Sequence, residues 1–267
     1  MGMRKRKVGL ALGGGAARGL AHIGVLEVLQ KEGIPIDMIA GTSAGAAIGA
    51  LYAQGKDASQ IKDLAVKMGR MQFLSLVDLA LPRSGFVEGT RIKNLLKSII
   101  GDIKFSDLSI PLACIATDIR SGEEMVINDG SVLEGVRASI SIPVIFSAVK
   151  WQDRYLVDGG LVNPVPVKTV REMGADFIIA VNVISDIGNR TRQAKKVKQP
   201  GMFQVILQSI YIATYSVVRS SLEGADIIIE PQLTNIGYGD FHRIRDCIAQ
   251  GELAAQESIP EIKKLLG

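Results

Sequence analysis

Apolar and polar residues alternate along the chain in blocks that favour strands and helices in turn. The apolar run at residues 7–12 is short and continuous, which is typical of a buried strand. Leu20, Ile23 and Leu26 follow at helical spacing, and Gly33 stands where a helix C-terminus favours glycine. Apolar runs predict strands at residues 7–12, 36–40, 112–117, 123–128, 148–151, 154–157, 177–183 and 226–230. Helical spacing predicts helices at residues 19–32, 44–54, 59–68, 91–100, 131–139, 165–173 and 202–218, and in a C-terminal region that Pro260 breaks.

The order of these elements indicates the class of fold. Two strand pairs, 112–117 with 123–128 and 148–151 with 154–157, are separated by short polar stretches and are expected to form hairpins. Helices interleaved with the other strands are typical of α/β proteins, in which helices cover both faces of a mostly parallel sheet. We therefore predict an α/β fold, and 267 residues suit one large domain or two small ones.

Composition and charge exclude several classes of protein. A hydrophobic share of 47% and only 9 prolines exclude a disordered chain. The net charge of +4 is small for a dedicated nucleic-acid binder, so we expect no nucleic-acid partner. The two cysteines, Cys114 and Cys247, have neither the spacing of a zinc site nor that of a disulfide framework, which suits a reducing compartment.

No segment of the chain demands export or membrane insertion. The basic residues 4–7 and the apolar residues after them resemble the start of a signal peptide, but Gly13 and Arg18 end the apolar run too early. Residues 199–218 are uncharged, yet their glutamines and tyrosines fall on one helical face, as in an amphipathic packed helix rather than a membrane span. We therefore expect a cytoplasmic protein.

A basic stretch lies just before that helix. Within residues 186–199 the only acidic residue is Asp186, and the basic residues are Arg190, Arg192, Lys195, Lys196 and Lys198. A solvated loop explains this composition. The alternative is a patch that meets anionic lipid headgroups, which would place the protein peripherally on the inner face of a membrane.

Glycine is abundant, and its first cluster lies where an anion site can form. Ten of the 29 glycines fall between Gly9 and Gly49. The stretch Gly-Gly-Gly-Ala-Ala-Arg-Gly at residues 13–19 joins a predicted strand to a predicted helix, but Arg18 breaks the dinucleotide-binding pattern and Leu20 breaks the P-loop pattern. A tight turn is one explanation. The other is a cradle of backbone N–H groups for an anion, such as the oxyanion formed in acyl transfer.

The second glycine cluster is a G-x-S-x-G motif. Gly41-Thr42-Ser43-Ala44-Gly45 lies between a predicted strand and a predicted helix, which is the context of a nucleophile elbow. Glycines are needed there because the turn is so sharp that Cβ atoms on either side would clash. The helix N-terminus favours the alkoxide of the serine. We therefore predict that Ser43 is a nucleophile.

An activated serine needs a base, and the chain offers few. Its 2 histidines are His22, in the first predicted helix, and His242, near the C-terminus. The order Ser43, Asp158, His242 is that of α/β-hydrolase triads, although only two predicted strands precede Ser43. Asp158, at the end of a predicted strand, is the other candidate base, and the Asp-Gly pair at this position is also common in hairpin turns.

Taken together, these motifs resemble one known family. Residues 13–19, 41–45 and 158–160 occur in the order and with the kind of spacing found in patatin-like phospholipases, of the bacterial group similar to the esterase domain of neuropathy target esterase. Ala-Ser-Ile-Ser-Ile-Pro at residues 138–143 and Asn-Pro at residues 163–164 also read as in that family. The resemblance covers about residues 8–183, and residues 184–267 match less distinctly.

The resemblance implies a three-layer α/β/α fold in one domain over residues 1–267, and a catalytic dyad without histidine. The site residues that it implies are Ser43 as nucleophile, Asp158 as base, Gly13, Gly14 and Gly15 as oxyanion hole, and Arg18 in support of that loop. It implies no cofactor and no metal. The expected activity is hydrolysis of a carboxylic ester in an acyl lipid, phospholipid or lysophospholipid, through an acyl-enzyme. An acyltransferase or thioesterase with the same dyad and a non-catalytic lipid-binding module are the alternatives.

Overall fold

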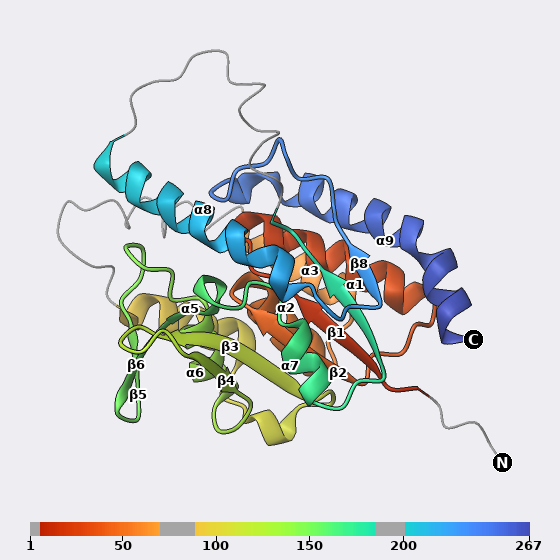
Figure 1. Ribbon diagram of the computed structural model, residues 1–267, viewed down its shortest axis with the longest axis horizontal. Helices are drawn as coiled ribbons and strands as arrows, with labels where there is room; N and C mark the ends of the chain where they lie inside the picture. Colours follow the sequence, from red (N-terminus) through yellow and green to blue (C-terminus); the bar gives the residue numbers. More distant parts are fainter. Residues whose placement is uncertain (1–5, 70–88, 185–200) are drawn as a thin grey trace.

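The chain folds around one mixed sheet, and its elements follow the order that the apolar pattern predicts (Figure 1). A computed structural model describes residues 6–69, 89–184 and 201–267. The strands are β1 (Val8–Leu12), β2 (Met38–Thr42), β3 (Leu112–Asp118), β4 (Glu124–Ile127), β5 (Val149–Trp151), β6 (Arg154–Asp158), β7 (Phe177–Val181) and β8 (Ile227–Ile229). The α-helices are α1 (Ala21–Lys31), α2 (Ala44–Ala53), α3 (Ala58–Gly69), α5 (Gly89–Ile100), α6 (Val132–Ser139), α7 (Val167–Glu172), α8 (Met202–Ser221) and α9 (Ile244–Leu266). Short 3-10 helices are η1 (Ala16–Leu20), η2 (Phe105–Asp107), η3 (Gly159–Leu161) and η4 (Phe241–Arg243).

The sheet is mostly parallel. Its strands lie in the spatial order β5-β6-β3-β2-β1-β7-β8, and β4 also pairs with β3. From β3 through β2, β1 and β7 to β8, neighbouring strands are parallel. β4 and β6 are antiparallel to β3, and β5 is antiparallel to β6, so both predicted hairpins are present. The prediction of an α/β fold with a mostly parallel sheet is confirmed.

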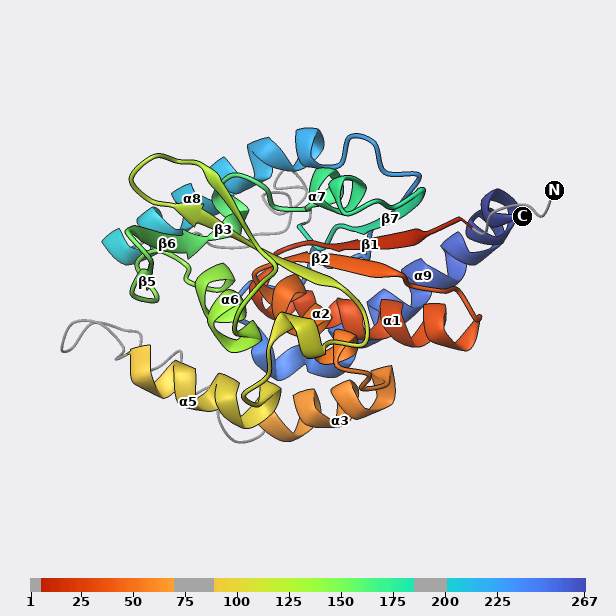
Figure 2. The ribbon, with the colours of Figure 1, turned by 90° about the horizontal axis from the view of Figure 1, so that it is seen from below.

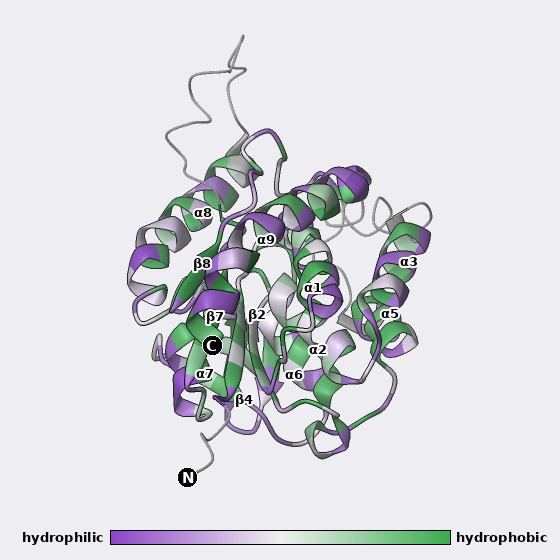
Figure 3. Cartoon of the chain, turned by 90° about the vertical axis from the view of Figure 1, so that its right-hand side faces the viewer, coloured by the Kyte–Doolittle hydropathy of each residue, from purple (hydrophilic) through white to green (hydrophobic). Residues whose placement is uncertain are grey.

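Helices cover both faces of the sheet, and the strand sequences explain why. Successive side chains of a strand point to opposite faces, so Leu10 and Leu12 join the larger apolar core while Ala11 joins the smaller one. Figure 2 shows α1, α2 and α9 on one face, with α3 and α5 outside them, and α7 and α8 on the other. Figure 3 shows apolar residues concentrated on the strands between these layers.

Some details differ from the sequence prediction. The first predicted helix begins as the 3-10 helix η1, and β2 begins at Met38, where its pairing with β1 starts. The C-terminal helix α9 is not broken but continues through Pro260. Ile259 and Ile262 on either side of that proline are buried, and α9 packs along α1. This burial outweighs the backbone hydrogen bond that proline removes.

Helix α8 is amphipathic, as predicted, but much of its surface is exposed. Val218 near its C-terminus is buried, whereas Met202, Val205 and Ile212 are exposed. Of the helices that the structure describes, none combines the length and the apolar character needed to cross a membrane. The basic stretch between residues 186 and 199 lies outside the described residues.

The C-terminal part of the chain packs on the N-terminal part. β8 extends the sheet by pairing with β7, and α9 lies along α1. Figure 1 shows this arrangement, with the ribbon of α9 running beside α1. These contacts support the proposal that residues 184–267 belong to the same domain as residues 8–183.

Candidate active site

Ser43 occupies a sharp turn between β2 and α2. Its backbone has φ of +53° and ψ of −119°, a strained conformation for a residue other than glycine. A Cβ atom on Gly45 would overlap the carbonyl oxygen of Leu12, and one on Gly41 would lie 2.5 Å from the nitrogen of Ala46. The glycines of the motif are therefore required by close backbone contacts. This geometry is that of the predicted nucleophile elbow.

Asp158 ends β6 and lies next to Ser43. The hydroxyl of Ser43 donates a hydrogen bond of 2.5 Å to Oδ2 of Asp158, and the N–H of Gly160 donates one of 2.8 Å to Oδ1. Burial of the carboxyl group raises the pKa of Asp158 to about 6, although both hydrogen bonds favour the charged form. The structure thus brings the two residues of the implied dyad into direct contact, and the raised pKa makes the carboxylate a stronger base.

The two histidines lie in different places, and neither connects Ser43 to Asp158. His242 is exposed on η4, and none of the hydrogen bonds in the described part of the chain joins it to Ser43 or Asp158. His22 is completely buried, with Nε2 2.7 Å from the carbonyl oxygen of Gly13, and burial lowers its pKa to about 4. His22 is therefore neutral at pH 7. The geometry does not form the Ser43–Asp158–His242 triad.

The glycine-rich loop lies against Ser43, but its N–H groups have different partners. Gly13 donates to the carbonyl oxygen of Val181 at 3.0 Å, and Gly14 donates to that of Pro164 at 2.9 Å. The prediction that these two glycines are oxyanion donors is therefore wrong, because their N–H groups already bind backbone acceptors. In the described part of the chain, the N–H groups of Gly15 and Ala16 donate to no protein acceptor. Both residues line a small hollow together with Ser43 and Asp158.

Arg18 connects the glycine-rich loop to a segment far along the chain. Its buried guanidinium donates through Nε to the carbonyl oxygen of Ile236 at 2.7 Å and lies 4.4 Å from the ring centroid of Tyr238. Tyr238 in turn stacks on Tyr211 of α8, with ring centroids 4.0 Å apart. These contacts support the proposed role of Arg18 in shaping the loop.

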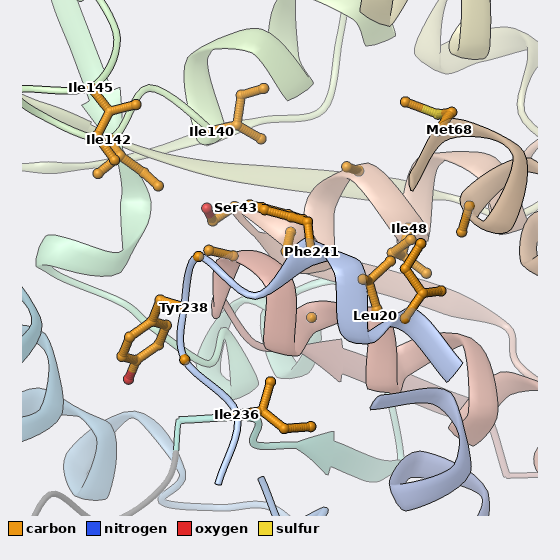
Figure 4. A pocket seen from close by; sticks show the side chains of 18 of the residues that line it. Leu20, Ser43, Ile48, Met68, Ile140, Ile142, Ile145, Ile236, Tyr238 and Phe241 are labelled. Atoms are coloured by element: carbon orange, nitrogen blue, oxygen red, sulfur yellow. The ribbon is translucent and has the colours of Figure 1, made fainter. Parts of the chain in front are cut away.

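A large apolar cavity opens beside Ser43. Its volume is about 900 Å³, and among the described residues that line it none is charged. Figure 4 shows Ser43 between Ile140 and Ile142 on one side and Tyr238 and Phe241 on the other. Met68 of α3 marks a more distant part of the wall. The cavity thus joins the dyad to a space that suits a long apolar group.

Several residues of the site were missed by sequence reasoning. Tyr238 and Tyr211 carry no motif that separates them from ordinary loop or helix residues, and Ala16 lies in the glycine-rich stretch but is not one of its glycines. Ser139 lies in the Ala-Ser-Ile-Ser-Ile-Pro stretch, which resembles the family, but the stretch by itself indicates no contact. Its hydroxyl accepts a hydrogen bond from the N–H of Ser43 at 2.8 Å. Only the fold brings this residue to the elbow.

Comparison with known proteins agrees with this geometry. The model of the patatin-like phospholipase family matches residues 10–171. An uncharacterised NTE family protein of Mycobacterium tuberculosis (strain H37Rv) is 32% identical over 194 residues, which cover 73% of this chain and 54% of that protein. Lysophospholipase nte1 of Emericella nidulans is 35% identical over 205 residues, covering 75% of this chain and 13% of its own length. Neuropathy target esterase sws of Drosophila melanogaster is 35% identical over 181 residues, which cover 66% of this chain and 13% of that protein.

A solved structure shares the fold. VipD from Legionella pneumophila has a TM-score of 0.56 and 15% identity, over 97% of this chain and 67% of that chain. The chain itself spans about half the length of the mycobacterial relatives and a small part of the longer eukaryotic ones. Since the family model matches more than half of the residues and includes both Ser43 and Asp158, the chain belongs to the patatin-like phospholipase family.

Proposed function

We propose that this chain is a serine carboxylic-ester hydrolase of acyl lipids, of the phospholipase or lysophospholipase type. The observation that carries the proposal is the hydrogen bond of 2.5 Å between Ser43 Oγ and Asp158 Oδ2, beside an uncharged cavity. The lysophospholipase and esterase names of the relatives agree with it.

In the first half of the reaction, Ser43 Oγ attacks the ester carbonyl carbon and its proton passes to Asp158 Oδ2. The N–H groups of Gly15 and Ala16 bind the resulting oxyanion, because both residues line the hollow and their N–H groups have no other acceptor within the described residues. The bond from the carbonyl carbon to the alcohol oxygen then breaks. The departing alcohol takes the proton from Asp158, and the acyl group stays on Ser43.

In the second half, a water molecule gives a proton to Asp158 while its oxygen attacks the acyl carbon. The bond to Ser43 Oγ breaks, Oγ recovers the proton, and the fatty acid leaves. An aspartate of ordinary pKa is a weak base for this purpose. Burial raises the pKa of Asp158 to about 6, which brings it closer to the value that suits a base at neutral pH.

The cavity supports a long acyl chain as the apolar part of the substrate. Pockets of about 300–1,000 Å³ bind ligands of drug size, and this one, at about 900 Å³, is near the upper end. Most of the residues that line it are aliphatic, and α2, α3 and α5 contribute many of them. A hydrocarbon chain can lie there without leaving any buried charge unpaired.

Contact with a lipid surface is part of the proposal. On α8, Val205, Ile206 and Ile212 expose apolar side chains, while Leu207 and Tyr211 of the same helix line the cavity.

Ile206→Glu and Ile212→Glu should therefore weaken sedimentation with neutral vesicles, and Ser220→Glu at the end of α8 serves as the control. Neutralising Lys195, Lys196 and Lys198 should weaken binding to anionic vesicles alone. If neither the α8 variants nor the lysine variants change sedimentation with vesicles, the membrane contact is removed from the proposal.

A fluorophosphonate probe tests the enzymatic proposal directly. The probe should label the folded protein at Ser43, and Ser43→Ala should abolish both labelling and ester hydrolysis. A panel of lysophospholipids, phospholipids and glycerides then identifies the substrate, with an added alcohol or thiol acceptor to reveal acyl transfer. Failure of the folded chain to react with the probe would leave the non-catalytic lipid-binding module as the better explanation.

A further inference from the structure

The segment at residues 138–143 touches both members of the dyad. Ser139, at the C-terminus of α6, accepts a hydrogen bond from the backbone N–H of Ser43 at 2.8 Å. Two residues later, the carbonyl oxygen of Ser141 accepts one from the backbone N–H of Asp158 at 2.9 Å. One short piece of chain therefore holds the backbone of the nucleophile and that of the base.

The hydroxyl of Ser139 both donates and accepts a hydrogen bond. It donates its single proton to the carbonyl oxygen of Ile115 on β3 at 2.5 Å, and its lone pairs receive the N–H of Ser43. Ser139 is fully buried, so water cannot replace the hydroxyl without a rearrangement. The hydroxyl thus joins the elbow to the strand that lies beside β2.

Asp158 is fixed by separate contacts to the same region. The hydroxyl of Thr117 on β3 donates to the carbonyl oxygen of Asp158 at 2.9 Å, and Ser141 accepts from its N–H. Asp158 is therefore held on both sides of its Cα atom. The position of Ser43 relative to this fixed carboxylate depends on the elbow, whose strained φ of +53° persists only where surrounding contacts enforce it.

We propose that Ser139 is a positioning residue, whose hydroxyl holds the backbone N–H of Ser43 so that the nucleophile stays aligned with Asp158. The inference rests on the proposed function. Ser139 touches neither the substrate nor the reacting atoms, and it acts through the backbone of Ser43. Loss of its hydroxyl leaves the N–H of Ser43 without an acceptor and allows the elbow to relax away from the carboxylate.

The test compares Ser139→Ala with Ser131→Ala. Ser131 caps the other end of α6 through the N–H of Glu134, so its replacement perturbs the same helix without contact to the dyad. The readouts are kcat and KM for a short soluble ester, the rate of fluorophosphonate labelling and the midpoint of urea unfolding. Ser139→Ala should lower kcat and the labelling rate about 10- to 100-fold with KM changed less than about 2-fold, as small misplacements of reacting groups do. Ser131→Ala should retain the wild-type rates.

A second variant separates the hydrogen bond from the space that the side chain fills. Ser139→Cys keeps a side chain of similar size, but sulfur is a weak acceptor, so it should lose activity as Ser139→Ala does. It also carries the test if Ser139→Ala does not fold. Wild-type kcat in the cysteine variant, or equal kcat in Ser139→Ala and Ser131→Ala, overturns the inference. A wild-type protein that neither hydrolyses esters nor reacts with the probe overturns the proposed function instead.

Discussion

Ser43 Oγ and Asp158 Oδ2 lie 2.5 Å apart although 115 positions separate them in the chain. The register of three strands explains this proximity. On β3, Ile115 lies beside Thr42 of β2, and the next residue, Ala116, lies beside Asp158 of β6. Only β3 therefore lies between β2, which leads into Ser43, and β6, which ends at Asp158. Any change that shifts β6 by one residue along β3 would turn Asp158 to the other face of the sheet.

Replacing each candidate base tests this direct contact. Asp158→Asn removes the carboxylate that takes the proton of Ser43, so kcat should fall about 10²- to 10⁴-fold, the usual contribution of a general base. His242→Ala changes an exposed residue on η4 and should alter kcat by less than about 3-fold, as most surface substitutions have small effects. Hydrolysis of a short soluble ester by the two purified variants decides the matter. The opposite ranking would restore the histidine triad.

The pKa of Asp158 gives the acid limb of the pH–rate profile. Burial raises this pKa to about 6, and only the charged form can accept the proton of Ser43. For a neutral ester, kcat/KM should therefore be level above pH 6 and fall about tenfold for each further pH unit below it. The labelling rate of the fluorophosphonate probe should follow the same curve, because it also requires an activated Ser43. A limb near pH 4 would contradict the assignment.

The same shift predicts that the base destabilises the fold. The pKa of Asp158 is higher in the folded protein than the value of 3.8 expected for an unperturbed carboxyl, so its contribution to stability is present below pH 4 and is lost as the pH rises through 6. At pH 7 the free energy of unfolding of Asp158→Asn, measured in urea, should therefore exceed that of the wild type by about 1–3 kcal/mol. The difference should disappear near pH 3.5. A variant less stable than the wild type at pH 7 would refute this interpretation.

The elbow could be predicted from the sequence because its signal is local, and the contact between Ser43 and Asp158 because the resemblance to the family pairs these two residues. Gly41 and Gly45 flank Ser43 within five residues, and the strand before and helix after it are readable from apolar spacing. The raised pKa of Asp158 required the fold, because it comes from burial. His22 illustrates the same limit, since no pattern indicates that its ring meets the carbonyl oxygen of Gly13.

The glycine-rich loop shows where sequence reasoning fails. Three consecutive glycines suggest three equivalent donors, but the partners of Gly13 and Gly14 are the carbonyl groups of Val181 and Pro164, which are remote in sequence. Which N–H groups remain for a substrate thus depends on packing between distant segments. The continuity of α9 through Pro260 has a similar cause, because contacts with α1 override a local preference.

His22 should make stability fall in mildly acidic solution. Its pKa is about 4 in the folded protein and 6.5 for an exposed imidazole, so its contribution is complete above pH 6.5 and is lost as the pH falls through 4. The shift corresponds to about 3 kcal/mol. Between pH 4 and 6 the titration of Asp158 changes stability in the opposite direction. The effect of His22 is therefore measured in a protein that already carries Asp158→Asn. There, adding His22→Gln should flatten the pH dependence of the free energy of unfolding, measured in urea. An unchanged slope would show that His22 does not titrate in this range.

The shape of the cavity predicts how chain-length selectivity can be altered. Ala65 of α3 lines the cavity, and Figure 2 places α3 in the outer helical layer. A larger side chain at this position should fill space that a long acyl chain needs while leaving Ser43 and Asp158 undisturbed. Ala65→Phe should lower kcat/KM for a hexadecanoyl ester by about 10-fold or more, in line with the cost of changing the fit of an apolar pocket. Activity on a butanoyl ester should stay within about 2-fold of the wild type, because short chains do not reach α3.

Lys67→Phe is the matched control for this prediction. Lys67 lies on the same helix but is exposed and does not line the cavity, so the aromatic ring would face solvent. It should leave the ratio of long-chain to short-chain activity unchanged. Urea unfolding of both variants checks that α3 remains packed. Equal losses on both esters in Ala65→Phe would mean that the ring disturbs the dyad. Equal retention of both activities would mean that the acyl chain lies elsewhere.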